Sequence, residues 1–341
     1  MKINRNIILI LFNIILSGMF FPFLISFSKE CIINYRDIKN VIEQYENIIV
    51  TSGIIKRLPD LSNKIQFLVV GRIDSKTVIN GKKDWLFYTS VTDGNLLADY
   101  EGKNYPSEQE FKIIKTTFIN NYEYLKTRGI KFVLLIAPNK GNIYREYLPK
   151  SIKQANKMTT EYIVEKLQSE ITSFPIIYPY EEFVKLHSKY LLFYPRDTHW
   201  NQLGSYIAYR AIMSNIFEAE TKSLEELKII EKVGKKGDLV EMLRLNDYFP
   251  SMTEYYIKDY KTSNNNIKTL EKDKSVLVII DSYGYYLVDY LKKSFRNINF
   301  VHRHKYMPSD LDKYKPDIVI FETVGRYLNH GSCLNFSFYG Y

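Results

Sequence analysis

The fold is decided at residues 275–284, which read SVLVIIDSYG. An unbroken run of aliphatic residues, 276–280, is typical of a strand that is buried on both faces, as in parallel sheets covered by helices. The run ends at Asp281-Ser282, and helical apolar spacing resumes over residues 285–295. We therefore expect a buried strand, then a turn that carries Ser282, then a helix; Asp281 is expected to be structural.

The chain on both sides repeats this alternation of strand and helix. Further strands are predicted at residues 131–137, 175–178, 299–302 and 317–321. Helical segments are predicted at residues 108–126, 159–171, 181–188, 202–217 and 310–314. The pattern predicts a three-layer α/β sandwich with a mainly parallel sheet, in which ligands bind beyond the carboxyl ends of the strands.

Two segments fall outside this alternation. Residues 79–82 read INGK, and Asn-Gly readily takes the positive φ angles of a type I′ turn, so a hairpin leading into a strand at 84–88 is expected. Residues 246–269 are polar and rich in Tyr and Asn. They predict a long excursion with a flexible tip at 263–266.

The N-terminus predicts a membrane segment. Lys2 and Arg5 precede an apolar stretch over residues 7–27, close to the ~20 residues that span a bilayer. Positive charge before the stretch places the rest of the chain outside the cytoplasm. A cleaved signal peptide ending near residues 26–28 is the alternative. An uncleaved segment predicts a single-pass protein of the cell membrane, and a cleaved one predicts a secreted protein. In both cases the bulk of the chain is expected outside the cytoplasm.

Composition narrows the classes of partner. The formal net charge is +9, but Lys rises together with Ile, Asn and Tyr along the whole chain, so we expect no nucleic-acid partner. The sequence has two cysteines, Cys31 and Cys333. It contains no cluster of Cys and His residues that would indicate a zinc site. Whether the two pair after export is left open. The expected segments are a signal anchor or signal peptide at 1–28, a connector at 29–70, a catalytic domain at 71–330 and a tail at 331–341.

Residues 197–201 read DTHWN and supply the other half of a candidate site. Ser282 is the candidate nucleophile, His199 the general base, and Asp197 the carboxylate that orients the imidazole. The alternatives are that Ser282 caps a helix and that Asp197 is a helix N-terminal aspartate. Asp197 and His199 lack a third metal ligand at a typical spacing, so neither a metal nor a cofactor is expected.

With Gly204 and Ala208, the DTHWN segment resembles the signature of the alginate O-acetyltransferase-like proteins, the DHHW family of the SGNH-hydrolase-like superfamily. Further similarities lie at residues 81–87, 138–149, 237–243, 276–282 and 315–326. The resemblance runs from about residue 71 to residue 328. It implies a circularly permuted SGNH-hydrolase-like fold, because the Asp/His block here precedes the serine block.

The resemblance is imperfect around the oxyanion hole. Ile280 stands where the family has glycine, and the loop after Phe321 lacks the oxyanion asparagine. The backbone N–H of Ser282 is one expected donor. Further candidates for oxyanion or substrate binding are Arg326, Glu322, Trp200, Tyr283 and Asn139.

Two of these candidate groups have alternatives. Arg326 and Glu322 could instead form an i,i+4 ion pair within a helix. Trp200 and Tyr283 could form a wall on which sugars stack, with core packing as the alternative for Trp200.

The function that the resemblance implies is an extracytoplasmic O-acyltransferase. It would transfer acetyl to hydroxyls of an exopolysaccharide or cell-surface glycan through a serine acyl-enzyme. A membrane-bound O-acyltransferase partner would donate the acetyl group. Two alternatives stay open: a carbohydrate acetylesterase with the same triad, and a non-catalytic glycan-assembly protein that keeps the fold.

Overall fold

A computed structural model describes residues 75–258 and 273–340. The expected membrane segment, the connector, Cys31 and the tip at 263–266 lie outside these residues. Within the two described ranges, no helix combines the length and the apolar character needed to cross a bilayer.

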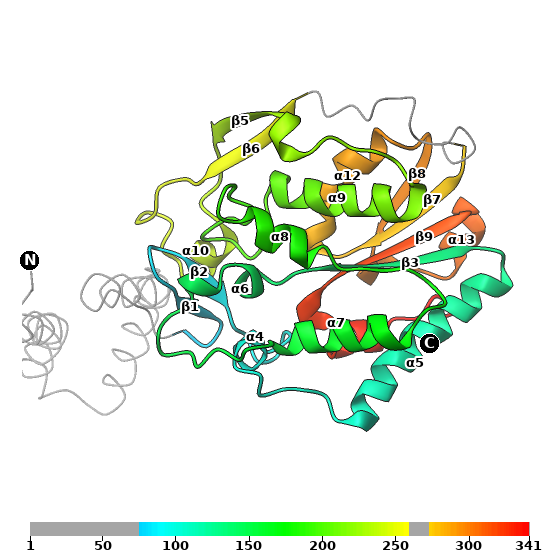
Figure 1. The fold of residues 1–341 in the computed structure, drawn as a ribbon, viewed down its shortest axis with the longest axis horizontal. Coiled ribbons are helices and arrows are strands. Elements are labelled where there is room, and N and C mark those ends of the chain that lie inside the picture. The colour runs from blue at the N-terminus through cyan, green and yellow to red at the C-terminus, as the bar shows by residue number, and fades with distance from the viewer. Residues whose placement is uncertain (1–74, 259–272, 341) are drawn as a thin grey trace, which may run out of the picture. The chain divides into compact units, whose positions relative to one another are not determined.

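The centre of the domain is a five-stranded sheet with the order β4-β3-β9-β7-β8 (Figure 1). All neighbouring strands in it run parallel. The strands are β3 Lys131–Ala137, β4 Ile176–Ile177, β7 Ser275–Ile280, β8 Asn297–His302 and β9 Ile318–Val324. Ile280 at the end of β7 is in register with His302 at the end of β8. The predicted parallel sheet is therefore confirmed, and its carboxyl ends form one edge.

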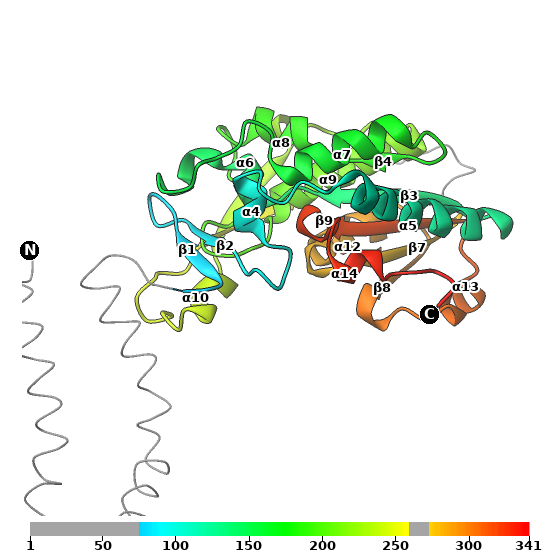
Figure 2. The ribbon, with the colours of Figure 1, turned by 90° about the horizontal axis from the view of Figure 1, so that it is seen from below.

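Alternate residues of the central strands belong to two separate cores, one on each face of the sheet. Val133 and Val278 pack with one layer of helices, and Leu134 and Ile279 with the other. The first layer holds α8 Tyr180–Leu186, α9 Gln202–Phe217 and α12 Tyr285–Lys292. The second holds α5 Glu108–Thr127, α7 Thr159–Glu170 and α13 Ser309–Tyr314. Figures 1 and 2 show α9 and α12 on one side of the sheet and α5 and α7 on the other.

Shorter helical elements connect these parts. The single-turn helices are α4 Leu96–Tyr100, α6 Lys140–Ile143, α10 Asp238–Met242 and α14 Gly331–Leu334. The 3-10 turns are Arg145–Tyr147, Leu224–Glu226, Ser282–Gly284, Arg303–Lys305 and Gly325–Tyr327. Those that directly follow β3, β7, β8 and β9 gather at the carboxyl edge of the sheet. Ligands bind at this edge in open α/β sheets.

Two antiparallel hairpins lie outside the main sheet. β1 Val78–Asn80 pairs with β2 Leu86–Tyr88, so the first hairpin is confirmed. Its predicted turn is wrong: positive φ occurs at Lys83 and Asp84, because the loop is longer than an Asn-Gly turn. The second hairpin, β5 Lys228–Val233 with β6 Thr253–Lys258, was expected to be irregular over its second strand, whose residues are mostly polar and half-exposed.

The C-terminal segment packs into the core and is not a tail. Phe336 and Phe338 are buried in the same core as β9, and the ring of Phe336 stacks on Phe321 at 4.6 Å between centroids. The Asn121 side chain binds the backbone of both Phe336 and Phe338. Cys333 is a buried free thiol in the described chain.

Candidate active site

Residues 197–201 form the loop that leads into α9. Asp197 binds His199 within this loop, and Asn201 caps the helix. Oδ1 of Asp197 lies 2.7 Å from Nδ1 of His199 and accepts the His199 backbone N–H at 3.0 Å. The Asn201 side chain accepts two backbone N–H groups from the first turn of α9 and caps that helix. Asn201 is therefore the N-cap of α9, which begins at Gln202, and the alternative that Asp197 is the helix N-terminal aspartate is wrong. Asp197 serves His199 instead.

Two hydrogen bonds join this loop to the turn that carries Ser282. The Tyr283 hydroxyl donates to the Thr198 carbonyl at 2.5 Å, and Nε1 of Trp200 donates to the Tyr283 carbonyl at 2.9 Å. The rings of His199 and Tyr283 lie 5.0 Å apart. Ser282 is half-buried and opens the turn one residue before Tyr283. The structure thus brings Ser282, His199 and Asp197 to one edge of the sheet.

Ser282 and His199 are not hydrogen-bonded to each other within the part of the chain that the structure describes. The hydrogen bond between a catalytic base and its nucleophile often tightens only when substrate binds.

A glycine brings a second carboxylate to the Asp/His loop. Gly237 has a φ of 107°, and a Cβ there would lie 2.1 Å from the Arg196 carbonyl oxygen. Only glycine permits both the backbone angle and this close approach. As a result, the backbone N–H of Asp238 donates to Oδ2 of Asp197 at 3.0 Å.

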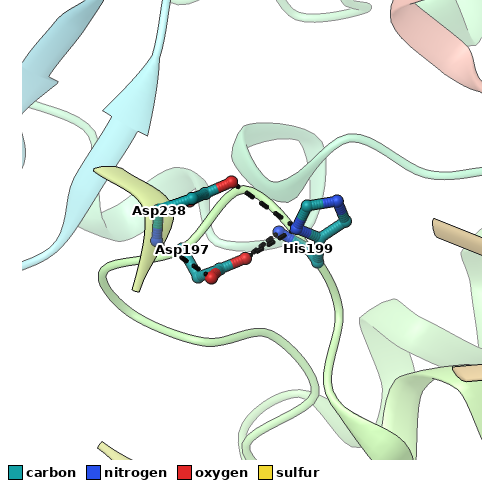
Figure 3. A group of neighbouring side chains, drawn as sticks. All are labelled: Asp197, His199 and Asp238. Atoms are coloured by element: carbon teal, nitrogen blue, oxygen red, sulfur yellow. Dashed lines mark hydrogen bonds and ion pairs between the residues drawn. The ribbon is translucent and has the colours of Figure 1, made fainter. Parts of the chain in front are cut away.

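The Asp238 side chain binds Thr198 of the Asp/His loop and lies close to the imidazole of His199 (Figure 3). Its oxygens accept the Thr198 N–H at 2.8 Å and the Thr198 hydroxyl at 2.5 Å. Its Oδ2 also lies 3.5 Å from Nδ1 of His199. The sequence pattern included Gly237-Asp238 among the family similarities but gave Asp238 no role, because nothing in its spacing connects it to His199.

Two lysines surround the Asp/His loop. Nζ of Lys235 lies 2.7 Å from Oδ2 of Asp197. Burial alone would raise the pKa of Asp197, but its hydrogen bond to His199 and the charges of His199 and Lys235 outweigh burial. The pKa of Asp197 is therefore held well below its usual range. Asp197 stays ionised, as an orienting carboxylate requires.

Lys140 lies beneath the same loop and is buried. Its Nζ donates to the carbonyls of Tyr194, Pro195 and Asp197 at 3.4, 3.2 and 2.7 Å. Burial lowers the pKa of Lys140 to about 7, while the nearby carboxylates oppose that shift. Lys140 thus holds the backbone that leads into Asp197.

Two buried carboxyl groups, those of Asp281 and Glu322, hold the backbone of the turn at Ser282 in place. Asp281 accepts the backbone N–H groups of Tyr283 and Val324, each at 2.8 Å. Glu322 in turn accepts the Asp281 N–H at 3.0 Å. Burial raises the pKa of Glu322 well above its usual range, and the charge of Asp281 adds to the shift. Asp281 is structural, as expected, and the buried Glu322 supports the turn from inside the protein.

Gly284 explains how the turn tolerates Ile280 in place of the family's glycine. A Cβ at Gly284 would lie 2.4 Å from Cγ2 of Ile280. The absence of a side chain at Gly284 therefore makes room for the larger residue at the end of the strand.

The weaker candidates from the sequence lie inside the protein. Trp200 and Tyr283 are 0% and 2% exposed, so neither offers a face on which a sugar could stack. Asn139 is buried and donates its amide hydrogens to Asp99 and Thr160. These three residues are therefore corrected from substrate contacts to core residues.

The proposed helical pair of Glu322 and Arg326 is also wrong. Glu322 lies within β9, and Arg326 lies in the following 3-10 turn, whose backbone Asn139 binds at 3.0 Å. The Arg326 guanidinium is buried, with Nε 3.6 Å from Asp93 and its centre 5.7 Å from the Tyr283 ring.

The site does contain a third group that could ligate a metal. Asp197, His199 and Asp238 each present one ligand atom, all within 4.8 Å of one another. The sequence shows no third ligand at a typical spacing, because Asp238 reaches the pair from a segment that is distant in sequence. Lys235 nevertheless already supplies a positive charge to Asp197 at 2.7 Å. The arrangement fits the orientation of an imidazole at least as well as it fits a cation.

Comparisons with known proteins identify the same family as the motifs. The family model for the SGNH hydrolase-like domain of acetyltransferase AlgX matches residues 78–297. A probable alginate O-acetylase AlgJ from Pseudomonas aeruginosa is 24% identical over 181 residues. The match covers 51% of this chain and 43% of that protein. The chain therefore aligns with less than half of this relative's length.

Three solved structures share the fold. The O-acetyltransferase domain of Pseudomonas putida AlgJ has a TM-score of 0.50 at 17% identity and covers 74% of this chain and 92% of its own. Bacillus cereus PatB1 has a TM-score of 0.54 at 14% identity, covering 75% and 98%. A DHHW family protein from Eubacterium siraeum has a TM-score of 0.55 at 13% identity, covering 78% and 97%.

These comparisons confirm the resemblance read from the motifs and relate the chain to O-acetyltransferases of the SGNH-like type. The chain belongs to the family of SGNH hydrolase-like domains represented by the acetyltransferase AlgX.

Proposed function

We propose that this protein is an extracytoplasmic O-acetyltransferase that modifies hydroxyls of an exopolysaccharide or cell-surface glycan. The family supports acetyl transfer to glycans, since the curated relative is a probable alginate O-acetylase. The observation that carries the proposal for this chain concerns Tyr283, the residue after Ser282. It binds Thr198 and Trp200, the two residues that flank His199. The base and the nucleophile are therefore on segments that are tied together.

The proposed reaction has two steps. The Ser282 hydroxyl attacks the acetyl carbonyl of the donor, His199 takes its proton, and the donor's alcohol leaves with that proton. A sugar hydroxyl then attacks the acetyl-serine, with His199 again accepting the proton and returning it to Ser282. Asp197 keeps the imidazole oriented and stabilises its protonated form. The backbone N–H of Ser282, at the start of a helical turn, is the proposed oxyanion donor.

The proposed location and partner rest on the N-terminal sequence and on what the family implies. The apolar stretch at residues 7–27 would anchor the chain, or export it if cleaved, with the catalytic domain outside the cytoplasm. A membrane-bound O-acyltransferase is the proposed source of acetyl groups.

The test uses the purified protein with a chromogenic acetyl ester as donor, and alginate-derived or cello-oligosaccharides as acceptors. Mass spectrometry measures acetylated oligosaccharide, and a coupled assay measures free acetate. We expect transfer that is lost in Ser282→Ala. Acetate release without transfer would instead identify an acetylesterase with the same triad. Equal activity of wild type and Ser282→Ala would leave a non-catalytic glycan-assembly protein.

A further inference from the structure

An exposed aromatic ring lies beside the candidate nucleophile. Tyr285 begins α12, three residues after Ser282, and is 59% exposed. Side chains three residues apart lie on the same side of a 3-10 turn. Tyr285 is therefore on the Ser282 side of the helix entrance, whereas the neighbouring Tyr283 is buried.

Two imidazole rings extend this aromatic surface. His302 ends β8, in register with Ile280 at the end of β7. Its ring stacks on Tyr285 with centroids 6.1 Å apart and planes at 20°. His304 is exposed, and its ring lies 5.2 Å from that of His302. We call Tyr285, His302 and His304 the aromatic row; it runs along the carboxyl edge of the sheet.

The chemistry of the row suits the apolar face of a sugar. Burial and the neighbouring His304 lower the pKa of His302, which favours the neutral form of its ring. A neutral aromatic ring presents a negative face. The C–H groups on one face of a pyranose carry a slight positive charge and pack against such a ring.

On the other side of the candidate site, the aromatic ring of Tyr286 already packs against other side chains of the protein. Tyr286 faces Lys235 at 5.9 Å and Tyr194 at 6.1 Å, and Lys235 is held by Asp197. Tyr194 itself is buried. The row at Tyr285 is thus the flank with a large open ring next to Ser282.

We propose that the aromatic row is the acceptor subsite, on which a pyranose ring of the glycan stacks so that its hydroxyl reaches the acetylated Ser282. The inference rests on the proposed function for its role in catalysis. Stacking itself does not depend on the triad, so binding and chemistry are separable by experiment.

The first test compares Tyr285→Ala, Tyr285→Phe and Tyr339→Ala. Tyr339 is 50% exposed on the C-terminal segment and packs on Tyr124 of α5, so it is a matched surface control. Each variant is checked for an unchanged thermal midpoint. For Tyr285→Ala we expect the acceptor KM to rise about tenfold, with hydrolysis of the chromogenic ester within about twofold of wild type. Tyr285→Phe and Tyr339→Ala should behave as wild type, because the Tyr285 ring, and not its hydroxyl, makes the contact.

The second test measures binding of the same oligosaccharides by calorimetry to wild type, Ser282→Ala and Tyr285→Ala. We expect Ser282→Ala to bind as wild type and Tyr285→Ala to bind about tenfold more weakly. Unchanged binding in Tyr285→Ala, or an equal loss in Tyr285→Phe, would overturn the subsite. Ring-dependent binding without serine-dependent chemistry would overturn the proposed function and keep the subsite.

Discussion

Oδ2 of Asp238 lies 3.5 Å from Nδ1 of His199, the ring nitrogen that contacts Asp197 at 2.7 Å. Two carboxylates therefore approach one edge of the imidazole. Their other contacts separate their roles. Asp238 uses both oxygens on Thr198, so it shapes the loop, and Asp197 has the shorter contact to the ring.

This difference predicts unequal effects of removing each charge. We expect Asp197→Asn to lower kcat by about 10³-fold or more, because an amide no longer selects the correct imidazole tautomer. Asp238→Asn should lower kcat by about tenfold, since the amide oxygen can still accept from Thr198. Steady-state hydrolysis of a chromogenic acetyl ester measures both. A larger loss in Asp238→Asn would show that the two assignments are reversed.

Lys140 offers a test of how the loop is held. Lys140→Met removes the donor to three backbone carbonyls, and we expect a loss of about 2 kcal/mol in the free energy of unfolding. We also expect kcat to fall, because the loop carries Asp197 and His199. Lys82→Met is the matched control, since Nζ of Lys82 binds one carbonyl at the surface, 2.8 Å away. Urea unfolding should show a larger loss of stability for Lys140→Met than for Lys82→Met. Equal losses would contradict the role of Lys140 in holding the loop.

Glu322 predicts a pH-dependent difference in stability. Its pKa in the folded protein is raised, so the folded state keeps a proton that the unfolded chain releases above about pH 4.5. The stability contributed by this group is complete below that pH and is lost as pH rises toward the folded-state pKa.

Glu322→Gln keeps an acceptor for the Asp281 N–H and does not titrate. The stability of the variant relative to wild type should therefore rise between pH 5 and 8, by at most about 1.4 kcal/mol per pH unit. Thermal unfolding across this range measures it, with Glu322→Ala as the variant that loses the hydrogen bond at every pH. A difference that does not vary with pH would mean that Glu322 is ionised in the fold.

Replacing Lys235 should change the pH below which activity is lost. Its charge helps to hold the pKa of Asp197 low. Lys235→Met removes a positive charge beside the Asp197–His199 pair, and it should therefore move the loss of activity at acid pH to a higher pH. At pH 7 the rate should stay within about threefold, because Asp197 remains ionised and keeps its 2.7 Å contact with His199. Lys232→Met, an exposed lysine over the Tyr256 ring, is the control. Identical pH–rate profiles for the two variants would exclude an effect of Lys235 on the carboxylate.

The sequence predicted the sheet well because burial on both faces leaves an unmistakable pattern. The helix at 202–217 and the strands at 131–137 and 275–280 have the predicted bounds. The hairpin β5–β6 lacks that pattern, since all residues of its two strands are exposed or half-exposed. The packing of Phe336 and Phe338 was missed because their partners, such as Phe321 and Asn121, are distant in sequence.

The same limit applies to the site. Asp197 and His199 are two residues apart, so local sequence was enough to pair them. Asp238 and Lys140 reach the loop only through tertiary structure, and no spacing rule connects them to it. Trp200 and Tyr283 show the reverse error: aromatic residues beside catalytic candidates suggested sugar contacts, but both are buried. The exposed ring is Tyr285, two residues further on.

The most direct test of the central claim is to trap the acetylated enzyme. Wild type is mixed with a chromogenic acetyl ester, quenched in acid within milliseconds to seconds, digested and mapped by mass spectrometry. The account predicts one acetyl group on the peptide that contains Ser282, its absence in Ser282→Ala, and its strong reduction in His199→Ala. Ester turnover at the wild-type rate in Ser282→Ala, or acetylation at another residue that persists in that variant, would contradict it.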